Sequence, residues 1–342
     1  ITVDNSGGGA AVFTTVTTTD GAVDLENIDD NLTATTVTAG GANDITLLTT
    51  TSGNVTIDAI DATGNLVRIT SAGSIAENGD AGTDITATNA ALRAGTGIGS
   101  GDAIETTITN LAFSNTTSGN VEVTNTGGLT IASVDGQVTS SNVGTGTTTL
   151  TASSPVTFAV NTSSGGTLTA NATESAAATD DITVNAVVTV QSTAGDVIFN
   201  AGDDIILTDN TSIVSAIGAN GDVTLNSGVA DTDNVGTQSL DGQVNANTTN
   251  GVVTLNLNAD GSATQAATGQ ITGTNLRLLS TGADGSFALA TSASNDVDTI
   301  AASTTGAINF RDSDGLAVGT VTTVGITTTS DDVRIETGTT LA

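Results

Sequence analysis

Apolar and polar residues alternate at period two along most of this chain, and short clusters of Gly, Asn and Asp interrupt the alternation. Alternation at this period puts every second side chain on one face of an extended segment, as in a β-strand. The polar positions are mostly Thr, Asn, Gly and Asp, which are poor helix formers. The pattern therefore predicts an all-β protein made of short strands joined by turns.

One five-residue phrase occurs six times, at 53–57, 119–123, 195–199, 221–225, 251–255 and 306–310. Each copy has a glycine, one further residue that is often Asn or Asp, and then an apolar, a variable and an apolar residue. The glycine with its neighbour predicts a turn that tolerates positive φ. The two apolar residues of each copy should point to one face, the inside. These predicted core residues are Val55, Ile57, Val121, Val123, Val197, Phe199, Val223, Leu225, Val253, Leu255, Ile308 and Phe310.

A longer repeat overlies the short phrase. The segment 85–89 returns at 271–275, an offset of 186, and the segment 119–134 returns at 306–321, an offset of 187. We assign the large repeat to approximately 73–136 and 268–321, within one continuous β-solenoid segment, 1–342, of a longer repetitive chain. Units that cannot bury an apolar face alone and recur with variable turns are typical of solenoids.

Short strands without helices favour a parallel β-helix, a β-solenoid rod in which each coil stacks on the one before. At roughly 20 residues for each coil the chain would make about 17 coils. Tandem β-sandwiches are the alternative, because they also have short strands at regular spacing. They would need hairpin turns and larger core residues, whereas this chain has six Phe and no Trp or Tyr.

Charge and composition exclude several functions. The chain carries 36 acidic residues against five arginines, a net charge of −31, so binding to nucleic acid is not expected. It has no Cys and no His, which removes thiol nucleophiles, zinc sites and near-neutral general bases. Paired carboxylates remain, but in Gly, Asn and Ser surroundings they are typical of turns. We therefore expect no enzyme activity, no catalytic residue and no resident cofactor.

Calcium is the ion that the available donors would suit, since it takes oxygen ligands and needs neither His nor Cys. Asp231 with Asp233, and Asp312 with Asp314, have an Asp-x-Asp spacing that a loop can fold around a cation. These four aspartates are the candidate calcium ligands. Diffuse screening by counter-ions is the alternative for so acidic a chain.

Four phrases together carry a family resemblance: AGSI at 72–75, ITATNAALRAGTGIGS at 85–100, NLAFSNTTSGNVEVTNTGGLTIASVDG at 110–136 and NAGDDIILTDNTSIVSAIGANGDVTLNSG at 200–228. Their order resembles the repeat regions of large secreted bacterial proteins of the filamentous-haemagglutinin-like class. The resemblance implies a right-handed β-helical stalk, exported across the outer membrane of a diderm bacterium, that serves in adhesion, matrix or surface filaments. The secretion domain and adhesive tip of a complete member are not recognisable here.

The expected function is that of an extracellular structural β-solenoid, part of a surface fibre, filament or matrix. The alternative is the stalk or binding module of a bacterial adhesin that recognises a glycan or matrix. We expect self-association, end to end or laterally into filaments, and an extracellular or cell-surface location. No run of about 18 apolar residues exists, so membrane insertion is not expected. A concentrated patch of Asn, Asp and Arg on one face or on a protruding loop would favour the adhesin.

Overall fold

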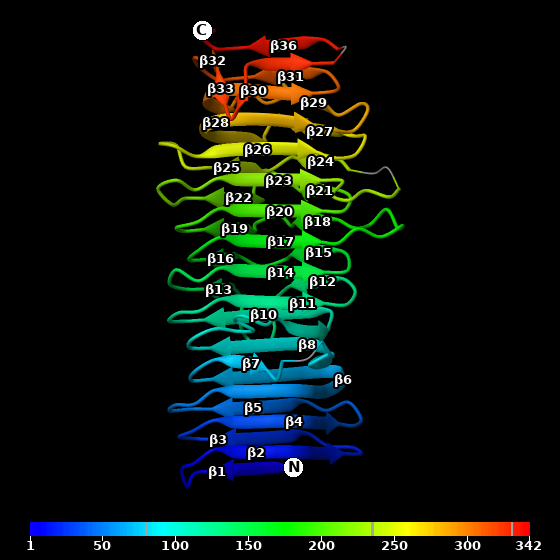
Figure 1. The fold of residues 1–342 in the computed structure, drawn as a ribbon, viewed down its shortest axis with the longest axis vertical. Helices are drawn as coiled ribbons and strands as arrows, with labels where there is room; N and C mark the ends of the chain where they lie inside the picture. The colour runs from blue at the N-terminus through cyan, green and yellow to red at the C-terminus, as the bar shows by residue number, and fades with distance from the viewer. Residues whose placement is uncertain (80, 234–235, 330) are drawn as a thin grey trace. The chain divides into compact units, whose positions relative to one another are not determined.

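The alternating segments form stacked parallel strands in the computed structural model, which describes residues 1–79, 81–233, 236–329 and 331–342. No helix occurs in these ranges, and the strands build a β-solenoid of about 14 turns (Figure 1). The predicted all-β class and parallel β-solenoid are confirmed. The chain divides into two compact units, Ile1–Ala152 and Ser153–Ala342, which are described separately.

The strands of the first unit follow one another at short intervals. They are β1 (Thr2–Asn5), β2 (Ala11–Thr18), β3 (Val23–Asn27), β4 (Leu32–Ala39), β5 (Ile45–Thr49), β6 (Val55–Ser71), β7 (Ile75–Glu77), β8 (Ile85–Ala94), β9 (Ile104–Thr107), β10 (Asn110–Asn115), β11 (Val121–Asn125), β12 (Leu129–Ile131), β13 (Ser140–Asn142) and β14 (Thr148–Ala152). At the start of this unit every second strand pairs, so that β1, β3 and β5 form one stack and β2, β4 and β6 another.

The second unit has shorter strands. They are β15 (Val156–Phe158), β16 (Thr162–Ser164), β17 (Leu168–Ala172), β18 (Ile182–Val184), β19 (Thr189–Ser192), β20 (Val197–Ala201), β21 (Ile205–Leu207), β22 (Ile213–Ala216), β23 (Val223–Ser227), β24 (Gln238–Leu240), β25 (Gln243–Asn245), β26 (Val252–Leu257), β27 (Ser262–Gln265), β28 (Gln270–Ser280), β29 (Ser286–Leu289), β30 (Asp296–Thr304), β31 (Ile308–Arg311), β32 (Ala317–Val318), β33 (Thr320–Val321), β34 (Thr323–Val324), β35 (Ile326–Thr328) and β36 (Val333–Glu336). From β15 to β25 every third strand pairs, so each coil adds one strand to each of three stacks.

The coils are longer than the roughly 20 residues expected from the sequence. In the first unit Leu32 lies opposite Val55, and the Asn31 side chain just before it bonds the backbone of Asn54 across a separation of 23 residues. In the second unit Val223 lies opposite Val253, and the side chains of Asn226 and Asn256 bond across a separation of 30 residues. The expected number of about 17 coils was therefore too high, because the loops between strands vary in length and the strand pattern does not count them.

The core is the row of inward side chains that the repeated phrase predicted. All twelve predicted core residues are at most 1% exposed, which confirms the assignment of inside and outside. The core is mainly Val, Ile, Leu and Ala. Phe158 and Phe199 stack with their ring centroids 5.6 Å apart, the aromatic pair found in the second unit.

At all six turn glycines of the phrase a Cβ atom would come within 3.0 Å of neighbouring backbone, and two of the six also have positive φ. Gly53 and Gly119 have φ of 100° and 87°, as predicted. The other four glycines of the phrase do not have positive φ, so their turns do not use the left-handed conformation that glycine tolerates. At Gly195 and Gly251 a Cβ atom would come within 2.4 Å of a backbone nitrogen, of Thr167 and Asn247 respectively. At these turns glycine is required because neighbouring backbone approaches closely.

Candidate functional site

Polar side chains outside the core stack from coil to coil. Four asparagines of the second unit form a ladder: Asn200 donates to Asn171, Asn226 to Asn200 and Asn256 to Asn226, through Nδ2 to Oδ1 at 2.8, 2.8 and 3.0 Å. Aspartates of the phrase also bond forward, since Asp196 Oδ1 accepts the backbone N–H of Asp222 at 2.9 Å. These turn aspartates therefore link consecutive coils.

The four predicted calcium ligands lie in different surroundings. The backbone N–H of Asp233 donates to Asp231 Oδ1 at 3.1 Å. Asp312 accepts a backbone N–H on each oxygen at 3.0 Å, from Asp314 on Oδ1 and from Val297 on Oδ2. Burial raises the pKa of Asp312 to about 6. Within the described ranges, Asp233 is the one of the four that lies in a group of three acidic side chains.

That group joins Asp233 to Glu174 and Asp203, and we call it the second-unit cluster. One carboxylate oxygen of each residue lies within 4.8 Å of the other two. Glu174 follows β17, Asp203 precedes β21 and Asp233 follows β23, so three successive coils contribute to it. Asp203 is fully buried, and its Oδ2 accepts the backbone N–H of Asp180 at 2.7 Å. Burial, with the nearby charges of Asp233, Glu174 and Asp180, raises the pKa of Asp203 to about 6.

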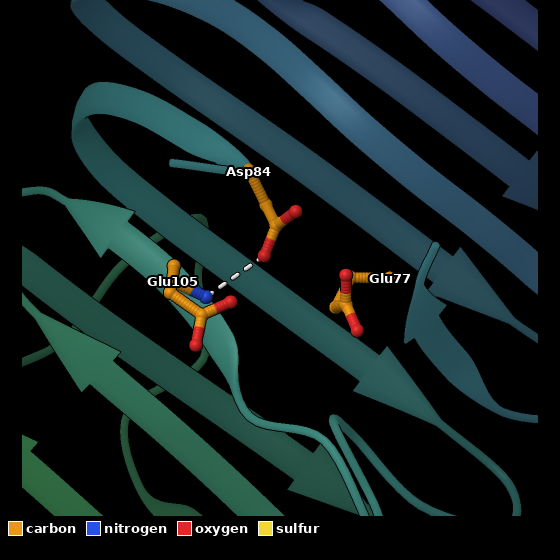
Figure 2. Close-up of side chains that lie close together, drawn as sticks. All are labelled: Glu77, Asp84 and Glu105. Atoms are coloured by element: carbon orange, nitrogen blue, oxygen red, sulfur yellow. Dashed lines mark hydrogen bonds between the residues drawn. The ribbon is translucent and has the colours of Figure 1, made fainter. Parts of the chain in front are cut away.

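A similar group in the first unit consists of Glu77, Asp84 and Glu105, the first-unit cluster. Figure 2 shows the three carboxylates turned toward a common space, with the backbone nitrogen of Glu105 donating to Asp84. That hydrogen bond, to Asp84 Oδ2, measures 2.8 Å. Asp84 is 1% exposed, and burial together with the charges of Glu105 and Glu77 raises its pKa to about 7. Burial also raises the pKa of Glu105.

A third feature is a loop folded against the outside of the first unit, residues 133–139, which we call the first strap. Val134 and Gln137 exchange backbone hydrogen bonds of 3.3 and 3.0 Å, which close a tight hairpin. The side chain of Val134 is 6% exposed and packs with Ala91 and Ala112, against which Leu66 also packs. Apolar contact therefore holds the strap on the sheet.

Two of the five arginines hold the tip of the first strap. Arg68 Nε and Arg93 Nη1 donate to Asp135 Oδ2 at 2.6 and 2.8 Å, and Arg68 also donates through Nη2 to Oδ1. Arg68 Nη1 bonds Thr46 Oγ1 at 2.9 Å. Hydrogen bonds from Arg68, then from Arg93, lower the pKa of Asp135 to about 2, so the carboxylate is ionised at neutral pH.

A pocket of about 310 Å³ lies beside this strap, lined by side chains including Arg93, Ser114, Asp135, Gln137 and Ser141. Both atoms of the Gln137 side-chain amide, Oε1 and Nε2, are buried and have no hydrogen-bond partner. The pocket therefore presents serine and threonine hydroxyls and the Arg93–Asp135 ion pair to any molecule that enters, whereas the amide atoms of Gln137 are covered from solvent.

The partners of Asp233 in this cluster were not among the predicted calcium ligands. Asp180 and Asp203 each begin an Asp-Asp pair, at 180–181 and 203–204, and their hydrogen bond spans 23 residues. The structure places the two pairs in consecutive coils, with Ile182 opposite Ile205. The two Asp-Asp pairs are 23 residues apart, so a coil length of 23 residues would have predicted that one pair lies above the other. Nothing comparable in the sequence points to Glu174.

Comparison of the chain with protein-family models, curated proteins and solved structures found no match. The described residues contain no helix that could span a membrane. The fold is that of a β-helix repeat protein, and its relation to the filamentous-haemagglutinin-like class rests on the sequence phrases alone.

Proposed function

We propose that this chain is a segment of an extracellular structural β-solenoid that forms part of a surface fibre, filament or matrix. The observation that carries the proposal is the stacking of parallel strands from coil to coil within each unit, about 14 turns in all. Each coil bonds the next through its backbone, so stability accumulates with the number of coils and does not depend on one large core. Such an architecture suits a protein whose task is to extend.

The outer side chains support the same role. The asparagine ladder adds hydrogen bonds between coils in the direction of stacking. The chain has no Cys or Met, the two residues most readily oxidised outside cells. Its net charge of −31 favours solubility and discourages random clumping. These properties fit an exposed fibre of the filamentous-haemagglutinin-like kind.

Self-association, end to end or lateral, belongs to this proposal. The first coil exposes apolar side chains, with Ile1, Val3 and Val12 at 52%, 36% and 65% exposure. Val3 lies opposite the buried Leu25, so a second copy that stacked on β1 would cover its side chain.

Two measurements test the proposal. Antibodies raised against the chain should label intact cells of the producing organism, and labelling only after permeabilisation would contradict an extracellular role. Electron microscopy of the purified protein should show particles whose size rises with protein concentration, in increments of one chain. A particle of constant size at every concentration would contradict self-association.

The alternative, a binding module that recognises a glycan or matrix, is favoured by one observation. The pocket beside the first strap combines Arg93, Asp135 and the hydroxyls of Ser114, Thr139 and Ser141, groups that pair well with sugar hydroxyls. Its volume of about 310 Å³ suits one or two sugar rings. Its lining includes an Arg and an Asp, two of the three residue types whose concentration on one face would favour an adhesin.

A glycan array separates the two functions. If the pocket binds sugar, the purified chain should retain a defined set of glycans, and Thr139→Ala, which removes an exposed hydroxyl of the pocket lining, should reduce retention. Val138→Ala is the matched control, because Val138 lies on the same strap but is 67% exposed and outside the pocket lining. No retained glycan, or equal retention by both variants, would leave the fibre role as the better account.

A further inference from the structure

The second-unit cluster leaves one oxygen of each carboxylate without a donor. Asp203 Oδ1, Glu174 Oε2 and Asp233 Oδ1 are all buried and accept no hydrogen bond. The opposite oxygens are occupied in two of the residues: Asp203 Oδ2 accepts from the Asp180 backbone, and Glu174 Oε1 accepts from the Thr232 backbone at 3.1 Å. Backbone donors thus fix two of these carboxylates, and each of the three keeps one buried oxygen without a donor in a group whose carboxylates lie within 4.8 Å of one another.

Such an arrangement has a high electrostatic cost unless a positive charge lies between the oxygens. Burying even one ionised carboxylate without a partner is unfavourable, and here three share one place. In the described ranges the salt bridges of the second unit join Arg311 and Arg334 to Glu336, so no arginine pairs with the cluster. The chain has no lysine that could do so.

We propose that Glu174, Asp203 and Asp233 bind a calcium ion. All three donors are carboxylate oxygens, which a hard cation prefers, and their separation of at most 4.8 Å lets one ion contact them all. Asp180 adds a fourth buried carboxylate nearby, with its Oδ1 also lacking a donor. Calcium accepts irregular and bidentate coordination, whereas magnesium requires a near-ideal octahedron of smaller radius.

Gly202 keeps the space beside this site open. A Cβ atom at residue 202 would lie 2.8 Å from Glu174 Oε2 and 2.9 Å from the Cβ of Asp180. Because the three donors come from loops of three successive coils, the ion would join those coils at their outer edge. In a chain without disulfides, calcium would therefore serve as the cross-link of this part of the second unit.

The first-unit cluster does not support the same assignment. There Asp84 Oδ2 accepts the Glu105 backbone N–H at 2.8 Å. Glu105 Oε2 is the one atom of that cluster found buried without a partner. The first-unit cluster therefore lacks the set of three unpartnered carboxylate oxygens on which the second-unit site rests.

Isothermal titration of calcium chloride into the metal-stripped chain at neutral pH tests the proposal. We expect a saturable site that Asp203→Asn and Glu174→Gln each weaken by about tenfold or more, since even supporting residues of metal sites produce such losses. The matched control is Asp298→Asn, which removes the same charge from an exposed position of β30. It should leave the affinity unchanged.

Circular dichroism shows whether each variant is folded, and melting with and without calcium measures how much the ion stabilises it. These two measurements distinguish loss of calcium binding from loss of folding. Glu174 is only partly buried, so Glu174→Gln should fold and should lose the rise in melting temperature that calcium gives the wild type. Absence of saturable binding in the wild type, or equal affinity in the wild type and both cluster variants, would overturn the site. Full displacement of calcium by an equal concentration of magnesium would overturn the choice of ion.

Discussion

Each unit carries a hairpin on its outer face, and the two hairpins differ in one charge. In the first strap Val134 is covered and Asp135, with φ of 52°, meets Arg68 and Arg93. The second unit has β33 and β34, which we call the second strap; its Val321 is also 6% exposed and is followed by Thr322, with φ of 61°. Val134 and Val321 are the final, corresponding positions of the repeated segments 119–134 and 306–321.

The strands around the straps correspond as well. In the first unit β10 pairs with β12 before the strap and with β13 after it. In the second unit β30 pairs with β32 before the strap and with β35 after it. The second strap contacts β28, which contains Arg277. Thr322 stands where the first strap has Asp135, and Arg277 Nε is buried without a hydrogen-bond partner.

Both straps lie against their sheets with a covered valine, and the second does so without an ion pair at its tip. We therefore infer that apolar packing positions a strap and that the ion pair of the first strap adds further stability. Valine is covered in both copies, but only the first copy has an acid at the tip. An arginine on the outer face gains a fixed partner when a strap brings a carboxylate to it. Local hydrogen exchange is the suitable measurement for testing this, since a solenoid opens region by region.

The largest effect should come from Val134→Asp. An ionised carboxylate cannot lie against Ala91 and Ala112, so the strap should detach and lose about 2 kcal/mol of local stability. Exchange of the Val134 and Gln137 amides should accelerate by about 30-fold. Val138→Asp, at a 67% exposed position of the same strap, is the control and should change exchange little. Equal acceleration in both variants would show that packing does not hold the strap.

Asp135→Asn should have a smaller effect, about 1 kcal/mol, because the pairs with Arg68 and Arg93 are partly exposed to solvent. The pKa of Asp135 is lowered to about 2, so its contribution is present above pH 4 and is lost as the pH falls from about 4 to 2. Strap protection in the wild type should decline over that range, whereas the Asn variant should show no decline from this group. If strap protection depended on pH identically in the wild type and in Asp135→Asn, the ion pair would not stabilise the strap.

Thr322→Asp should give the second strap the carboxylate that Asp135 provides in the first strap. If Arg277 accepts the new carboxylate, the amides of β33 and β34 should gain about 0.5 to 1 kcal/mol of protection. Thr322→Asn, which has the same shape without the charge, is the control. A loss of protection with Asp but not with Asn would mean that the acidic surroundings outweigh Arg277.

Added salt should have the smallest effect. Raising ionic strength from about 0.05 to 0.5 M screens partly exposed ion pairs, so the first strap should lose a few tenths of a kcal/mol. The second strap has no such pair in the described part of the chain and should show little change. Amide exchange at both straps can be followed in the same salt titration, so each strap serves as the control for the other. Equal changes at the two straps would contradict a role for the ion pair in the first strap.

Much of the fold could be read from local pattern. Period-two alternation identified all twelve core residues of the phrase, because a strand buried on one face must alternate. Coil length could not be read in the same way, since loops tolerate insertions at little cost. The strand partner of Val223 accordingly lies farther along the chain than that of Leu32. Of the second-unit cluster, the sequence identified Asp233 but paired it with its neighbour Asp231.

The sequence by itself determined the strand class, the inward face and the offset of the large repeat, because each depends on residues close together or on self-similarity. The tertiary structure alone decided which distant side chains meet. Asp135 finds Arg68, which is 67 residues away, and Thr232 beside Asp233 finds Glu174, which is 58 residues away. Whether two such side chains come into contact depends on the summed lengths of the coils between them. A loop of variable length changes that sum without altering the local pattern of apolar and polar residues.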